Sequence, residues 1–276
     1  MPGTIYSRQI LFLLFTCCLF FYCGDKVPNY WPANGSSVRN ISWYVPLADS
    51  SALLHHENNI WTLPRPLNSN QPETTFTHHI KPQKRYLFDA FDKSDQIVTH
   101  HSGRIQHEYY RFRRNGVFLL GYSGADSSKL YTIYEPPLLI LPDQLNFIDS
   151  TLTSETVPKI RDAAADSFRT DHTTRLRLTV KQRGQLKIGT TLVPAVLVKM
   201  SLSRDATVGF GDQNLIVPDA VMVQSYVLVA PKIGPVLEWE IQTLNDRSSL
   251  PADEEFEQKA YEPFERIIKI TRHQFF

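Results

Sequence analysis

The chain of 276 residues has an ordinary globular composition, with 42% hydrophobic and 21% charged residues. A chain of this kind can bury a sizeable core, which excludes disorder as its main state. The 29 Lys and Arg residues nearly balance the 28 Asp and Glu residues, so the formal net charge is +1. This balance argues against a nucleic-acid-binding protein that works by bulk electrostatics.

The N-terminus has the features of a secretory signal. Residues 10–22 read ILFLLFTCCLFFY, and Arg8 is the one charged residue before position 23. This run is too short to cross a hydrocarbon core about 30 Å thick as a helix. It matches the apolar region of a signal peptide that follows a positively charged start. We therefore interpret residues 1–22 as a signal peptide, with a buried core helix as the alternative.

All three cysteines, Cys17, Cys18 and Cys23, lie in or directly after this segment. The rest of the chain can form neither a disulfide framework nor a thiol nucleophile. A cysteine after such a segment resembles the acylated cysteine of bacterial lipoproteins, although Tyr22 stands where that pattern has a small residue. The resemblance implies lipid attachment at Cys23, because the polar sequence starts directly after it, and Cys17 and Cys18 are the alternatives.

Acyl chains at Cys23 would make a membrane the first partner of the protein, since each buried CH₂ group adds about 0.8 kcal/mol. Gly24 follows Cys23 in place of the Asp that retains enterobacterial lipoproteins at the inner membrane, which favours the outer membrane. Simple secretion is the alternative, and with it a eukaryotic origin in which Asn34 and Asn40 begin N-x-S glycosylation sequons.

Residues 23–75 are rich in Pro, Asn and Ser, so we expect a tether that continues as an irregular segment. Trp31, Trp43 and Trp61 are expected to anchor it locally.

Short strands are expected next, at 86–88 and 97–99. Residues 105–122 predict a hairpin, because Asn115-Gly116 favours a type I′ turn. Residues 130–141 predict two short strands, separated by Pro136-Pro137.

The clearest strand signal starts at Thr174, where Leu176, Leu178 and Val180 alternate with polar residues. Further strands are predicted at 195–203, 220–230, 236–244 and 266–272, and an exposed loop is predicted at 204–216. In the strand at 236–244, Leu237 and Trp239 alternate with Glu238 and Glu240.

Helix signals are few and lie at 154–168 and 252–262. The sequence therefore predicts a mainly β (α+β) domain over residues 76–276. We expect a curved antiparallel sheet or half-barrel with one or two helices. Such a sheet could enclose an apolar groove for an acyl chain, or its aromatic side chains could simply fill the core.

No catalytic motif stands out. The sequence has no G-x-S-x-G, no phosphate-binding G-x-x-x-x-G-K-[ST] and no H-E-x-x-H. Histidine pairs occur at 55–56, 78–79 and 100–101. Neighbouring residues on a strand face opposite sides, so each pair offers one ligand to a given site. We predict no enzyme activity, no catalytic residue, no cofactor and no metal; the alternative is an envelope enzyme with a histidine-based metal site.

Several short motifs are spread along the chain: Tyr30-Trp31-Pro32, Gly35, Trp43-Tyr44, Tyr134–Leu138, Gly189, Val193-Pro194-Ala195, Ile233–Val236 and Glu240. They resemble landmarks of a group of uncharacterised bacterial envelope lipoproteins, although Lys232–Val236 departs from the Gly-Val-Gly-Leu-Val that is usual there. That group is thought to have open β-sheets like the lipoprotein carriers LolA and LolB. The resemblance implies a non-catalytic binding or structural role in the envelope, on the periplasmic face or the cell surface, with a lipid or an envelope protein as partner.

Overall fold

The fold is described from a computed structural model of the chain. The predicted signal peptide, Cys17, Cys18, Cys23 and the helix predicted at 252–262 lie outside the described residues. The structure describes residues 30–46, 55–64, 72–83, 89–101, 105–124, 131–145, 147–162, 167–210, 213–243 and 266–275.

Strands make up nearly all of the regular structure. The described residues contain no α-helix, and one 3₁₀ turn lies at Asp89–Phe91. The strands are β1 (Ser37–Pro46), β2 (His55–Glu57), β3 (Ile60–Thr62), β4 (Glu73–Ile80), β5 (Gln96–His100), β6 (Ile105–Arg113), β7 (Gly116–Gly124), β8 (Tyr131–Pro142), β9 (Thr151–Asp162), β10 (Ser167–Thr170), β11 (Thr174–Ile188), β12 (Thr191–Phe210), β13 (Gln213–Ala230), β14 (Gly234–Thr243) and β15 (Arg266–Phe275).

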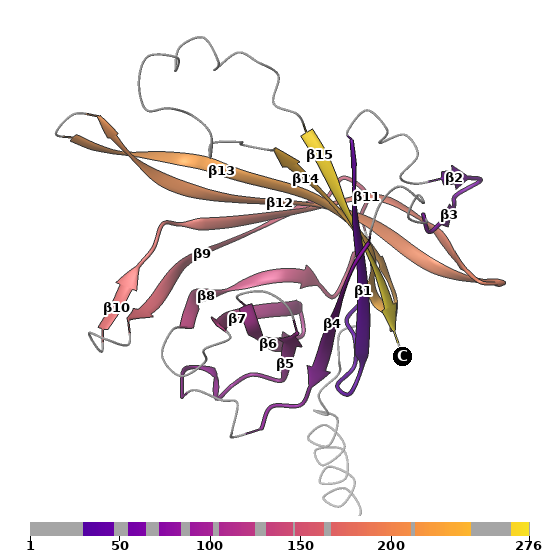
Figure 1. Ribbon diagram of the computed structural model, residues 1–276, viewed down its shortest axis with the longest axis horizontal. Helices are drawn as coiled ribbons and strands as arrows, with labels where there is room; N and C mark the ends of the chain where they lie inside the picture. The colour runs from indigo at the N-terminus through magenta and orange to yellow at the C-terminus, as the bar shows by residue number, and fades with distance from the viewer. Residues whose placement is uncertain are drawn as a thin grey trace, which may run out of the picture.

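The sheet closes on itself. Its strand order is β10-β9-β8-β7-β6-β5-β4-β1-β15-β14-β13-β12-β11-β3-β2, and β9 also pairs with β11. This pairing joins 12 antiparallel strands, β9 through β1 to β11, into a barrel (Figure 1). The expected mainly β, antiparallel sheet is confirmed. The expected half-barrel is wrong, because the last free edges of the sheet pair with each other and close the barrel.

The helix predicted at 154–168 is also wrong. Residues 151–162 form β9, which pairs with β11 in its first half and with β8 in its second half. The start of β9 reads TLTSETV and is rich in β-branched residues that favour strands. Thr156 is fully buried where β9 pairs with Thr174 of β11. Pairing on both sides outweighs the local helix signals of Ser154 and Pro158.

The loop predicted at 204–216 is instead a hairpin that runs on beyond the ring (Figure 1). β12 continues to Phe210, and β13 returns from Gln213 in register with it. A bulge between Arg204 and Ala206 separates the hairpin from the part of β12 in the barrel. Bulges of this kind bend a strand without ending it.

The range 23–75, expected to be a tether and an irregular segment, contains β1, β2, β3 and the start of β4. β1 is a full member of the ring, between β4 and β15. The expected anchors are buried: the exposed fractions are 9% for Trp31, 2% for Trp43 and 1% for Trp61.

The predicted turn at 115–116 and the predicted strand break at 136–137 both differ from the structure. The hairpin between β6 and β7 is confirmed, but neither Arg114 nor Asn115 has the positive φ of a type I′ turn. The positive φ belongs to Gly116 (145°), where a Cβ would lie 2.3 Å from the carbonyl oxygen of Leu141. β8 continues through Pro136-Pro137, because these residues fall in a gap of both pairing registers, where no N–H is needed.

Both faces of the sheet bury apolar side chains. One cluster fills the barrel and includes Leu176, Leu178 and Val180. A second cluster covers the outside, where Trp61 of β3 packs with Trp43, Leu237 and Trp239. A third, smaller cluster includes Phe91 and Tyr109. A bulge in β11 between Val180 and Gln182 separates its barrel half from the half that pairs with β3.

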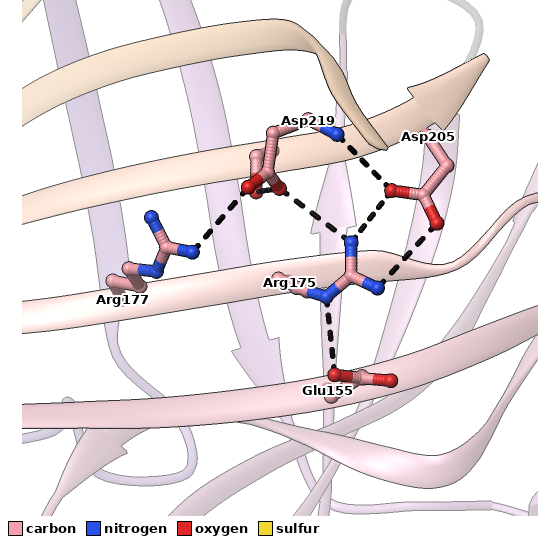
Figure 2. A network of polar contacts seen from close by, with 6 residues as sticks. Glu155, Arg175, Arg177, Asp205 and Asp219 are labelled. Atoms are coloured by element: carbon pink, nitrogen blue, oxygen red, sulfur yellow. Dashed lines mark hydrogen bonds and ion pairs between the residues drawn. The ribbon is translucent and has the colours of Figure 1, made fainter. Parts of the chain in front are cut away.

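An ion-pair network joins β9, β11, β12 and β13 where the long hairpin leaves the barrel (Figure 2). Arg175 Nη1 lies 2.6 Å from Asp205 Oδ1 and 3.5 Å from Asp219 Oδ1, and its Nε lies 3.1 Å from Glu155 Oε2. The backbone N–H of Asp219 donates to Asp205 Oδ1. Among the described residues, Arg177 forms an ion pair with Asp219 alone, at 3.4 Å. Arg175 is therefore the centre of this network.

We expect Arg175→Met to lower the melting temperature near pH 7 more than Arg177→Met does. Hydrogen bonds from Arg175 and from the Asp219 backbone lower the pKa of Asp205, and a hydrogen bond from Ser203 with nearby arginines lowers that of Asp219. An acid whose pKa is lowered by folding stabilises the fold above its unfolded pKa, about 4, and loses this effect as the pH falls through its folded pKa.

The measurement is a set of thermal unfolding curves between about pH 7 and about pH 2. The wild type is expected to lose stability steeply towards acid, and Arg175→Met to show a flatter acid limb. Equal curves for the two arginine variants would contradict the central place of Arg175.

Candidate functional site: a cavity inside the barrel

The barrel contains a partly open cavity of about 270 Å³. One part of its lining is apolar, and the other carries amide, hydroxyl, imidazole and carboxyl groups. A mostly apolar cavity with a few polar groups is the usual form of a small-molecule site. The apolar wall includes Val98, Ile140, Leu141, Val198, Val227 and Val229.

Trp31 lies against this cavity from the segment that precedes β1. Its indole Nε1 donates to Oε1 of Gln96 at 2.7 Å, and its ring lies 5.0 Å from that of Tyr110. Gln96 Nε2 donates to the Pro32 carbonyl at 3.1 Å. The backbone N–H of Gly35 donates to the carbonyl of His79 on β4. These bonds fix the segment across the strands that it contacts.

Glu108 of β6 is the first carboxyl group of the cavity. The Tyr110 hydroxyl donates to Glu108 Oε2 at 2.6 Å, and His100 Nε2 lies 3.0 Å from the same oxygen. Burial raises the pKa of Glu108, but the contacts with His100 and Tyr110 outweigh burial and the pKa is lowered. Glu108 is therefore ionised at neutral pH.

Glu238 of β14 is the second carboxyl group. Burial, with the charge of Glu240 on the same strand, raises the pKa of Glu238 to about 7. Contacts with Ser225 and Lys269 act in the opposite direction but are weaker. Near neutral pH this group is divided between its protonated and ionised forms.

His273 of β15 presents an unpaired nitrogen. Burial, with His79 nearby, lowers the pKa of His273 to about 4, so the ring is neutral at pH 7. Its Nδ1 lies 2.8 Å from Asn40 Oδ1, an acceptor, and therefore carries the ring proton. The other nitrogen, Nε2, is a bare acceptor that is buried and has no hydrogen-bond partner.

The structure separates two of the histidine pairs as predicted for strands. His79 and His100 line the cavity, whereas their neighbours His78 and His101 contact each other, with ring centroids 4.8 Å apart. The side chains of the pair at 55–56 are not described. Among the described residues, no three His, Cys, Asp or Glu side chains are grouped to hold a metal ion.

The two carboxyl groups of the cavity were not singled out from the sequence. The alternation of Glu238 with Leu237 was read correctly, but it did not show which residue faces the barrel. Leu237 belongs to the outer cluster and Glu238 to the cavity. Glu108 lies in the hairpin predicted at 105–122, and no motif in the sequence marks it. The predicted lipid-attachment residue, Cys23, lies outside the described residues, seven positions before Tyr30.

The chain matches no protein-family model, no curated protein and no solved structure. In the part of the chain that the structure describes, no helix has the length and apolar character needed to span a membrane.

Proposed function

We propose that this protein is a non-catalytic binding protein of the bacterial cell envelope, which takes a small amphipathic ligand into its barrel and is held to the membrane by acyl chains at Cys23. The observation that carries the proposal is the cavity, with its apolar wall and its few polar groups. A cavity of about 150 Å³ holds benzene. On that scale, a cavity of about 270 Å³ has room for roughly ten non-hydrogen atoms.

The anchor and the barrel lie close together along the chain. Seven residues lead from Cys23 to Tyr30, next to the Trp31 that lines the cavity. Even fully extended, they reach at most about 25 Å. An acylated Cys23 would therefore keep the Trp31 end of the barrel within that distance of the membrane surface. This arrangement suits a ligand that is taken from the membrane or from its surface.

The test is the mass of the full chain after extraction from the membrane, with and without inhibition of signal peptidase II. Under denaturing conditions we expect an N-terminus at Cys23 that carries the mass of acyl chains. Under native conditions we expect a further, non-covalent mass of a small organic molecule. An unacylated chain cut at another position would overturn the anchor.

A Cys23→Ser variant is the matched control, since Cys17 and Cys18 stay in place. It is expected to lose the acyl mass. If acylation persisted, the attachment site would be one of those two cysteines.

A further inference from the structure

We infer that the ligand of this cavity carries a protonated amine, which binds among the carboxylates of Glu108 and Glu238 and the bare Nε2 of His273. This inference rests on the proposed binding function and names the chemical class of the ligand.

The first argument is the charge of the lining. Two carboxyl groups line the cavity, and none of the described lining residues is a Lys or an Arg. A buried charge is costly unless it is paired. Glu108 has His100 and Tyr110, but the contact of Glu238 with Ser225 does not offset its burial, and the carboxyl group holds its proton up to about pH 7. A cationic ligand would supply the partner that the lining lacks.

The second argument is the direction of the hydrogen bonds. His273 donates its one ring proton to Asn40 and leaves Nε2 as an acceptor without a donor. Leaving a buried acceptor unpaired costs stability, so a ligand that donates to it is favoured. An ammonium group has three donors and no acceptor. It therefore has one donor for each of the three acceptor groups in the lining, the imidazole and the two carboxylates.

Lys269, a cation near Glu238, does not remove the preference of the cavity for a cationic ligand. Lys269 of β15 stands directly opposite Glu240 in the β14–β15 register, whereas Glu238 stands opposite Thr271. Lys269 is near enough to lower the pKa of Glu238 slightly, yet burial and Glu240 prevail. Thus Glu238 faces Ser225 on β13, Glu240 on its own strand, Lys269 on β15 and Glu108 on β6.

The apolar wall determines the size and polarity of the part of the ligand that does not carry the charge. Room for roughly ten non-hydrogen atoms fits one short chain or one ring that carries the amine. Three probes of this size differ only in the head group: octylammonium, octanol and octanoate. The experiment is isothermal titration of the full chain in lipid nanodiscs with each probe, with empty nanodiscs as the reference.

At pH 8 we expect octylammonium to bind at least tenfold more tightly than octanol, and octanoate to bind most weakly. At pH 5.5 octylammonium is expected to bind at least tenfold more weakly than at pH 8. Glu238 is then protonated, whereas an alkylamine, which titrates like Lys at about 10.4, keeps its charge.

Glu238→Gln is expected to remove both the tenfold preference and its pH dependence, while octanol binding changes less than about threefold. Glu240→Gln is the matched control: it removes the next carboxyl group on the strand, outside the cavity lining, and is expected to keep the preference. Thermal unfolding confirms that each variant is folded.

Val198→Phe places a ring in the apolar wall and is expected to weaken the binding of all three probes. That result would show that the probes bind inside the barrel. If octanol and octanoate bind as tightly as octylammonium, the amine inference is wrong and the binding function stands. If no probe binds to the wild type, the binding function fails as well.

Discussion

Replacing Gln96 by Leu is expected to lower the free energy of unfolding by about 3 kcal/mol or more. Gln96 is fully buried and serves three partners at once. Its Oε1 accepts from Trp31 Nε1 and lies 2.9 Å from His79 Nδ1, and its Nε2 donates to the Pro32 carbonyl. Leu has a similar size but no polar atom, so all three partners stay buried and unpaired. Each unpaired group costs about 1–3 kcal/mol.

The Trp31→Phe variant separates the contribution of the indole hydrogen bond from the contributions of the other two contacts of Gln96. It removes the one N–H that Gln96 accepts from this ring and keeps an aromatic side chain against Tyr110. Urea denaturation of both single variants and the double variant gives the coupling energy. We expect a coupling of about 1 kcal/mol, because the double variant no longer leaves the indole N–H unpaired. A Gln96→Leu variant as stable as the wild type would show that the Trp31 segment is held by apolar packing alone.

The predictability of this fold depended on how many faces of each strand are buried. The alternation of Leu176, Leu178 and Val180 identified β11, because a one-sided apolar pattern has period two. In β14 the same alternation was visible, but both faces are buried, since Trp239 packs outside and Glu238 lines the cavity. In such a strand the polar residues are mistaken for the solvent-exposed face. A carboxyl group inside the barrel looks like a solvent-facing residue in the sequence.

Closure of the barrel could not be read from the sequence for a related reason. It depends on the pairing of β9 with β11, in which Thr151–Thr156 meet Thr174–Thr179. The alternation of Leu176 and Leu178 identifies a strand but does not show which strand lies beside it, and residues 151–156 contain one apolar residue, Leu152. The local pattern at 154–168 favoured a helix, and tertiary pairing overrode it. Without closure, a cavity inside the barrel cannot be predicted either.

The cavity residues illustrate the same limit. His79, Glu108 and His273 lie on three strands that are far apart in the sequence, and only the ring order β15-β1-β4-β5-β6 brings them to one space. The spacing of these residues along the chain does not indicate that they lie close together in the fold. The separation of His78 from His79, in contrast, follows from strand geometry alone and could be predicted.

Replacing Gly121 by Ala is expected to have the largest effect on the fold, with a loss of more than about 3 kcal/mol of unfolding free energy or no soluble chain. A Cβ at this position would lie 2.0 Å from the backbone oxygen of Thr132 and 2.9 Å from the ring of Phe91. Neither neighbour can move aside: Thr132 is held in β8, and Phe91 is fully buried and stacked on Tyr109 at 4.0 Å.

Gly189→Ala is the matched control for Gly121→Ala. Gly189 has a φ of 61°, but a Cβ there would meet nothing within 4 Å. Its cost is therefore limited to the backbone strain of a left-handed Ala, about 1–2 kcal/mol. Urea denaturation of both variants separates steric contact from strain. Equal losses would mean that β7 and β8 can separate locally at Gly121, and the close approach of these strands would then not be what requires glycine there.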